Sequence, residues 1–430
     1  MLNIKTEITT NEIPSIYESF CSLIGENHWV KRTKEVKQQI KGHKYLEDYL
    51  KNENNISFSL SEIGKLIKNN KYINNSSFNN NHYSAVGFAA QILSIMPSLS
   101  KENKSKIIRR IHGGFRNPVD IRAFQLELLA ATHFVHNGYE ITWPEMEGSG
   151  NFDLFVNDIG AQGLQVECKT ISGDKGKRIH KKESLDFYHE LNRIFKKIGN
   201  NLNTGLIVKV TLPKRLPKAF KEICHLSNLI KEQILLGKSE DFNEISIRIE
   251  ECDFSEIEMI KNESDIYLRR DRIDIFTNTQ NKNTGIITGK NGGVIVILQS
   301  KQDDTIMSSM FNTLNESAKN QINPNLPAMF LVGLHDIGYG ELQEIAHQEY
   351  SPDENPTALQ LSTSKFLNKS SNNNFIAVSF IDKSYMGTRL LNEPRRSGNA
   401  FIYKNEDSSF WSQEFSNLLN RENKLTKILL

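Results

Sequence analysis

The chain has 430 residues, of which 38% are hydrophobic and 24% charged, and its net charge is only +2. This length predicts two or three domains with cores of their own. The balanced charge excludes a strongly basic or acidic protein, so any nucleic-acid partner has to be recognised from local patches. The start lacks a basic leader with an apolar core, and no apolar run is long enough to span a bilayer, so we expect a cytoplasmic protein without a membrane partner.

The four cysteines lie far apart, with no CxxC pair. This spacing predicts reduced thiols rather than a zinc site or a disulfide framework. The stretch from Thr284 to Gly293 lacks the first glycine and the Ser/Thr of a phosphate-binding loop, so we predict no nucleotide cofactor.

Residues 1–112 are predicted to be a mostly helical and polar region that binds substrate or a partner. The asparagine-rich segment from Asn69 to Tyr83 predicts a solvated loop within it. A helix should then begin with Asn117 as N-cap and Pro118 at its first position, and end at Gly138. Its apolar stripe at helical spacing is Phe124, Leu128, Ala131 and Val135.

Short strand patterns follow this helix, joined by glycine-containing turns. They begin at Tyr139, Phe152 and Leu164, and precede an amphipathic helix over 184–198 and an apolar strand over 205–212. The predicted order is α-β-β-β-α-β. We therefore expect an α/β fold in which helices flank a mixed sheet, with a core over residues 113–252.

The remaining sequence predicts further α/β elements. A helix over 217–236 closed by Gly237 leads to an alternating strand from Glu244. A strand from Val294, a helix over 305–321 and a strand from Ala328 come later. Residues 253–430 are expected to form a C-terminal α/β region of unknown role.

Charged residues interrupt two of the predicted strands. Residues two apart in a strand point to one face, so Glu167 and Lys169 should share a face, while Phe152, Val166 and Cys168 take the other. If the strands from Phe152 and Leu164 pair, Asp153 lies next to Glu167. Close carboxylates are unfavourable unless a cation lies between them, and hard oxygen ligands suit Mg²⁺.

This set of groups predicts metal-assisted attack on a phosphodiester. The metal activates water and neutralises charge on phosphoryl oxygens, while Lys169 orients or activates the water. Glu127 lies three residues after Phe124 and four before Ala131, against the apolar stripe of the preceding helix, where a carboxylate needs a partner.

The order of Glu127 in a helix, Asp153 in a strand and Glu167-Cys168-Lys169 in the next strand resembles the PD-(D/E)XK nuclease superfamily. The resemblance covers residues 117–212 and implies the restriction endonuclease-like core. It implies that Asp153, Glu167 and the Cys168 carbonyl bind Mg²⁺, for which Mn²⁺ could substitute. It also implies that Lys169 assists the water and that Glu127 is an accessory acid. Phe152 stands where the family motif has proline, which supplies no ligand.

A basic stretch follows the motif, with one acid, Asp174, among five basic side chains. Next to a metal site it predicts contact with a phosphate backbone, whereas by itself such a run is usually a solvated face. The predicted nucleic-acid-binding residues are Lys175, Lys177, Arg178, Lys181 and Lys182.

The sequence thus predicts a Mg²⁺-dependent nuclease. A DNA endonuclease of a restriction or anti-phage type is favoured, by analogy, over an enzyme acting on RNA or on ends during repair. The alternative is a nuclease-fold protein that binds nucleic acid or assembles without turnover. Sequence specificity, homo-oligomerisation and an activating protein partner stay open at this stage.

Overall fold

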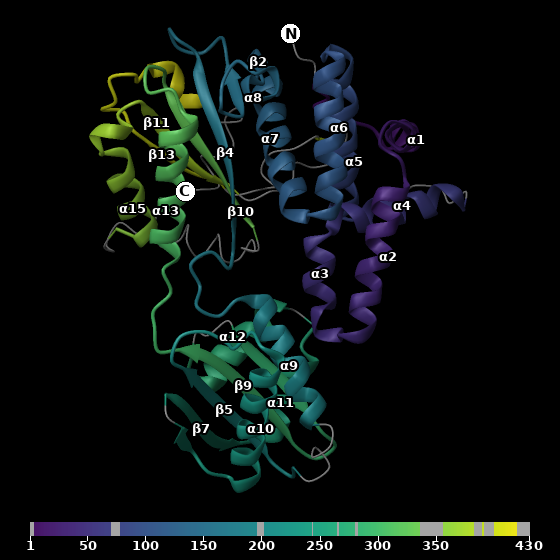
Figure 1. The fold of residues 1–430 in the computed structure, drawn as a ribbon, viewed down its shortest axis with the longest axis vertical. Helices are drawn as coiled ribbons and strands as arrows, with labels where there is room; N and C mark the ends of the chain where they lie inside the picture. The colour runs from purple at the N-terminus through teal and green to yellow at the C-terminus, as the bar shows by residue number, and fades with distance from the viewer. Residues whose placement is uncertain are drawn as a thin grey trace. The chain divides into compact units, whose positions relative to one another are not determined.

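The computed structural model describes residues 4–69, 78–195, 202–242, 244–264, 266–279, 283–335, 356–381, 389–390 and 400–418. The chain forms two compact units (Figure 1). Unit 1 comprises Met1–Lys37, Lys51–Lys175 and Met307–Leu430, and unit 2 comprises Gln38–Leu50 and Gly176–Ile306. Within the described ranges, every helix is too short or too polar to traverse a bilayer.

The N-terminal region is helical, as predicted. Its α-helices are α1 (Ile13–Ile24), α2 (Asn27–Gly42), α3 (Glu47–Glu53), α4 (Asn55–Lys68), α5 (Asn80–Ile95) and α6 (Lys101–Arg116). The loop predicted over Asn69–Tyr83 is wrong at its end, because the Asn79 side chain accepts hydrogen bonds from two backbone amides and caps α5. Residues 70–77 of that segment lie outside the described ranges.

The helix and three strands predicted around the charged motif are confirmed. They are α7 (Pro118–His136), β2 (Ile141–Thr142), β3 (Leu154–Val156) and β4 (Leu164–Ser172), with a short α8 (Pro144–Glu147) between β2 and β3. Asn117 caps α7 and Pro118 opens it. The strands pair antiparallel, β2 with β3 and β3 with β4, which places Leu154 opposite Val166.

These strands belong to a six-stranded mixed sheet in unit 1, ordered β13-β11-β10-β4-β3-β2. Strands β10 (Ala328–His335) and β11 (Phe375–Ile381) continue it in parallel with β4, and β13 (Ala400–Lys404) closes it antiparallel. A separate short parallel pair joins β1 (Glu7–Ile8) and β12 (Arg389–Leu390). The general α/β class with helices on a mixed sheet is therefore as predicted.

The fourth strand of the core is not the predicted one. The strand predicted over 205–212 forms as β5 (Gly205–Leu212) but pairs with strands of unit 2, whereas β10 lies beside β4. The helix that precedes β10 is α13 (Ile306–Gln321). The sequence from Gly176 to Ile306 is thus inserted between β4 and α13, and the division differs from the predicted boundaries after residues 112 and 252.

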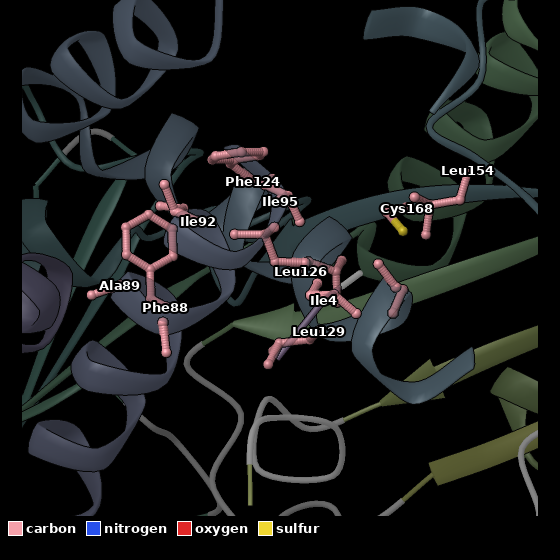
Figure 2. Packing of buried hydrophobic residues seen from close by; sticks show 14 of the residues in the cluster. Ile4, Phe88, Ala89, Ile92, Ile95, Phe124, Leu126, Leu129, Leu154 and Cys168 are labelled. Atoms are coloured by element: carbon pink, nitrogen blue, oxygen red, sulfur yellow. The ribbon is translucent and has the colours of Figure 1, made fainter. Parts of the chain in front are cut away.

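Helices cover both faces of the unit 1 sheet. Val166 and Cys168 of β4 belong to the core cluster that contains α7 residues such as Leu126 and Leu129, and Figure 2 shows Leu154 and Cys168 beside one another. The opposite face packs against α13 and α15 (Ala358–Leu367). Phe152 belongs to this second cluster. The prediction that Phe152 shares a face with Val166 and Cys168 is therefore wrong, because β3 begins only at Leu154 and the pleat does not extend back to Phe152.

Unit 2 is a second α/β unit, built on a five-stranded sheet ordered β6-β7-β5-β9-β8. One core cluster packs α9 and α10 on this sheet, and another packs α11 on its other face. Besides β5, the elements of unit 2 have these bounds: α9 (Lys181–Phe195), α10 (Phe220–Leu236), β6 (Glu240–Phe242), β7 (Ile245–Cys252), α11 (Phe254–Asn262), α12 (Ile266–Thr277), β8 (Thr284–Thr288) and β9 (Gly293–Ser300).

Candidate active site

The end of the β3–β4 ladder brings the two predicted strand acids together. Asp153 directly precedes β3, and its Oδ2 accepts a hydrogen bond of 2.7 Å from the Cys168 backbone N–H. The Asp153 backbone N–H in turn donates to Glu167 Oε2 at 3.3 Å. Asp153 is 8% exposed and Glu167 is fully buried. Beyond the last β3–β4 pair, Leu154 and Val166, side-chain oxygens thus accept the backbone hydrogen bonds that a neighbouring strand would otherwise accept.

Lys169 shares a face of β4 with Glu167, as the pleat predicts. Its Nζ lies 2.5 Å from Glu167 Oε1 and donates a hydrogen bond of 2.7 Å to Gln321 Oε1. Ser317, one turn earlier on α13, also donates to Gln321 Oε1. Gln321 ends the helix predicted over 305–321, where its pattern favoured a surface position over one near the sheet, and it lies 152 positions beyond Lys169. Only the pairing of β4 with β10 brings α13 to this position.

Glu127 on α7 has a partner that sequence reasoning missed. Arg110 of α6 donates from Nη1 to Glu127 Oε2 at 2.7 Å and from Nη2 to Oε1. The guanidinium also lies over the Phe124 ring, 4.6 Å from its centroid. Glu127 is 4% exposed, so this bidentate pair meets the need of a buried carboxylate.

The site concentrates negative charge in a buried region. Burial raises the pKa of Glu127 to about 8 and that of Glu167 to about 8, and the neighbouring Asp153 charge adds to both shifts. Burial likewise raises the pKa of Asp153 to about 6, against the Cys168 N–H and Lys169. Glu145 of α8 adds further negative charge near Glu127 and Asp153. Four acids therefore act on one another with two cations, Arg110 and Lys169, among them.

The oxygen atoms of Asp153 and Glu167 are the candidate ligands of the predicted divalent cation. Among the described residues, no three His, Cys, Asp or Glu side chains form a metal-binding group. Mg²⁺ needs fewer than three protein side chains, since it commonly uses one or two carboxylates with waters and substrate oxygens. Glu167 Oε1 is buried without a hydrogen bond of good geometry, although Lys169 lies close by. Asp153 and Glu167 therefore fit a hard cation.

The predicted backbone ligand also fits. The Gln165 N–H is bonded to the Pro327 carbonyl on the β10 side, so alternate residues of β4 face β3. The N–H of Cys168 meets Asp153 on that β3 side. Its carbonyl leaves the same edge of the strand, where the ladder with β3 has ended. The Cys168 thiol is buried in the α7-side cluster with its pKa raised well above the ordinary value by burial, so it supplies no ligand.

The basic stretch is divided between the two units. Lys175 is exposed and ends its part of unit 1, whereas Lys177, Arg178, Lys181 and Lys182 belong to unit 2. The Arg178 backbone N–H donates to Asp304 Oδ1 at 2.7 Å, and its Nε donates to the Asp303 carbonyl at 2.9 Å. Lys181 and Lys182 open helix α9, and Lys182 Nζ lies 3.1 Å from Asp186 Oδ2. The stretch is therefore partly structural, and its contact with nucleic acid stays a prediction.

Comparisons with protein-family models, with characterised proteins and with solved structures each found no match to this chain. Any function assigned to this chain therefore depends on the geometry of the site. Its members are Asp153, Glu167 and Lys169, with Glu127 and Arg110 beside them.

Proposed function

We propose that this chain is a divalent-metal-dependent nuclease of the PD-(D/E)XK kind, with DNA as its favoured substrate. The observation that carries the proposal is the convergence of Asp153, Glu167 and Lys169 at the end of the β3–β4 ladder. Buried carboxylates with raised pKa values are costly to a fold, and such groups gather where function requires them.

The order of elements around the site supports the proposal. Without the insertion, and apart from the short α8, the chain runs α7, β2, β3, β4, α13 and β10, with β10 parallel to β4. This is the α-β-β-β-α-β order that the resemblance implies, reached through a different fourth strand. Topology alone does not establish activity, so the proposal depends on the side chains of Asp153, Glu167 and Lys169.

Each residue has a role in this proposal. Asp153, Glu167 and the Cys168 carbonyl would hold Mg²⁺ or Mn²⁺, which supplies Lewis acidity toward phosphoryl oxygens and lowers the pKa of a bound water. Lys169, fixed by Gln321, orients the attacking water. Arg110 holds Glu127 in place as an accessory acid and adds positive charge near a substrate phosphate.

A second candidate is a protein that binds nucleic acid without cleaving it. The observation in its favour is that no three metal-ligating side chains gather among the described residues. Against it, a binding protein gains nothing from a buried acid pair beside a lysine. A restriction or anti-phage role for an active enzyme rests on analogy.

The deciding experiment incubates the purified protein with plasmid DNA, linear DNA and RNA, with Mg²⁺, with Mn²⁺ or with chelator. We expect metal-dependent cleavage, lost by at least about 100-fold in Lys169→Ala and Asp153→Asn. Lys101→Ala, a change at an exposed position of α6, is the matched control and should retain activity. Absence of cleavage of any substrate, together with retained nucleic-acid binding, would favour the second candidate.

A further inference from the structure

A small cavity in unit 1 lies outside the candidate active site. Its volume is about 30 Å³, and its lining includes Arg122 of α7, Asn55 of α4, Thr170 at the end of β4, and Gly333 and His335 at the end of β10. Thr170 alternates with Lys169 along β4, so the two side chains point to opposite faces of the sheet. The cavity is therefore on the α7 side of the sheet, away from the Lys169 ammonium.

Arg122 is held rigidly at the edge of this cavity. Its Nη1 lies 2.8 Å from Glu53 Oε1, which also lies 3.1 Å from His335 Nε2. The Arg122 side chain is only 9% exposed. Burial opposes ionisation of Glu53, but His335 and Arg122 together hold the pKa of that carboxyl below its ordinary value. The guanidinium thus has a fixed orientation before any ligand binds.

Two of the residues that line this cavity carry a donor for which the described part of the chain supplies no hydrogen-bond partner. Arg122 Nε and Thr170 Oγ1 are both buried and make no hydrogen bond to the residues that the structure describes. Both contacts of Arg122 to Glu53 run through Nη1, so they leave the Nε side of the guanidinium unused. A buried donor without a partner costs about 1–3 kcal/mol, so such groups indicate a bound water or ligand.

The unused donors define the chemistry of an occupant. The Nε side of a guanidinium presents N–H groups in a planar fork, which matches two oxygens of a carboxylate or phosphate. The Thr170 hydroxyl adds a further donor. A volume of about 30 Å³ holds roughly two waters, so the part of an occupant inside the cavity has to be small.

We propose that this cavity binds one oxyanionic group, a phosphate or a carboxylate, through the Nε side of Arg122 and the Thr170 hydroxyl. This site is independent of the proposed nuclease activity. Glu53 orients Arg122 through Nη1, and His335 in turn holds Glu53. In this proposal Glu53 Oε1 and His335 Nε2 do not contact the anion.

The test measures thermal unfolding and calorimetric binding of the full chain with inorganic phosphate or acetate, against chloride at equal ionic strength. We expect saturable stabilisation by at least one of the two anions. Arg122→Lys keeps a positive charge beside Glu53 but removes the fork, and Thr170→Val removes the unpartnered hydroxyl at nearly constant volume. Each variant should weaken anion binding about tenfold.

Matched controls keep the result interpretable. Arg109→Lys changes an exposed arginine of α6 in the same unit and should bind the anion as the unmodified chain does. Thr170→Val should fold at least as stably as the unmodified chain, because it removes a buried hydroxyl that makes no hydrogen bond to the described residues. It therefore remains informative even if Arg122→Lys lowers stability.

A nucleoside 5′-monophosphate and a 5′-phosphorylated oligonucleotide identify the source of the group. Binding of these and of phosphate, without acetate, assigns the cavity to a terminal phosphate, whereas binding of acetate alone assigns it to a carboxylate. The proposal is overturned if neither anion acts beyond chloride, or if both variants bind the anion as tightly as the unmodified chain.

Discussion

At the scale of single residues, the dominant feature is burial of acids that would prefer water. Glu127, Asp153 and Glu167 are at most 8% exposed, and all three have raised pKa values. For acids whose folded pKa lies above the unfolded value, the stabilising contribution is full below the unfolded pKa. It is lost as pH rises through the folded pKa. These acids therefore favour the fold at mildly acidic pH and destabilise it by about pH 8.

The same shifts predict how metal affinity depends on pH. A cation competes with the protons on Asp153 and Glu167, so apparent Mg²⁺ or Mn²⁺ affinity should rise as pH increases from about 5 to 8, by up to about tenfold per unit for each proton released. Calorimetry in buffers of different ionisation enthalpy counts those protons. Glu167→Gln should weaken both the binding and its pH dependence, and an affinity independent of pH would contradict the assignment.

At the scale of elements, two helices outside the motif hold the site together. Helix α6 contributes Arg110 to Glu127 of α7, and α13 contributes Gln321 to Lys169 of β4. Both contacts join elements that no local pattern connects. They make the geometry of the site depend on how these helices pack on the core.

The contact between α6 and α7 should contribute to stability. Arg110→Ala leaves the Glu127 carboxylate buried without this partner, so we expect the free energy of unfolding to fall by about 3 kcal/mol in urea denaturation at pH 9, above the pKa of about 8 that Glu127 has in the folded chain. Combining it with Glu127→Met should recover most of that loss, because no buried charge remains. A cost of Arg110→Ala below about 1 kcal/mol would show that Glu127 is solvated or protonated instead.

The contact between α13 and β4 should affect the reaction more than the fold. Gln321→Ala frees the Lys169 ammonium from one of its two partners, so we expect the rate of metal-dependent cleavage to fall about tenfold with little change in substrate affinity. The exposed neighbour Asn320→Ala is the control. Equal cleavage rates for both variants would remove Gln321 from the site.

At the scale of the whole molecule, unit 2 interrupts unit 1 between β4 and α13, and its two connecting segments meet at Gly176. The Gly176 carbonyl accepts a hydrogen bond of 2.8 Å from the Thr305 N–H. Gly176 has φ +79°, and a Cβ there would lie 2.6 Å from the Thr305 carbonyl oxygen. Only glycine satisfies both the left-handed backbone and this close approach.

The role of Gly176 at this junction can be tested by alanine substitution, with Gly237 as the matched control. Gly176→Ala should destabilise unit 2 by about 2–4 kcal/mol, since it adds a clash to the backbone strain. Gly237→Ala, at φ +61° with nothing within 4 Å of the new Cβ, should cost only about 1 kcal/mol. Amide hydrogen exchange in β5 and β9 measures both. Equal costs would show that the contact with Thr305 relaxes.

Local patterns in the sequence determined most of the elements and the central motif. Asn117, Pro118 and Gly138 predicted the limits of α7, and the two-residue period placed Glu167 and Lys169 on one face. These features follow from the residue and its near neighbours. The prediction for Phe152 is wrong because the two-residue period was extended beyond the first residue of β3.

Only the tertiary structure decided which strand completes the core and which partners the acids have. Strands β5 and β10 are both buried apolar runs that follow amphipathic helices, so their sequences predict the same local structure. Their positions in separate sheets depend on long-range pairing and packing. For the same reason Arg110 and the group of Glu53, Arg122 and His335 escaped prediction, and Gln321 was expected at the surface instead of beside Lys169. Each contact joins residues on different elements, and packing alone brings them together.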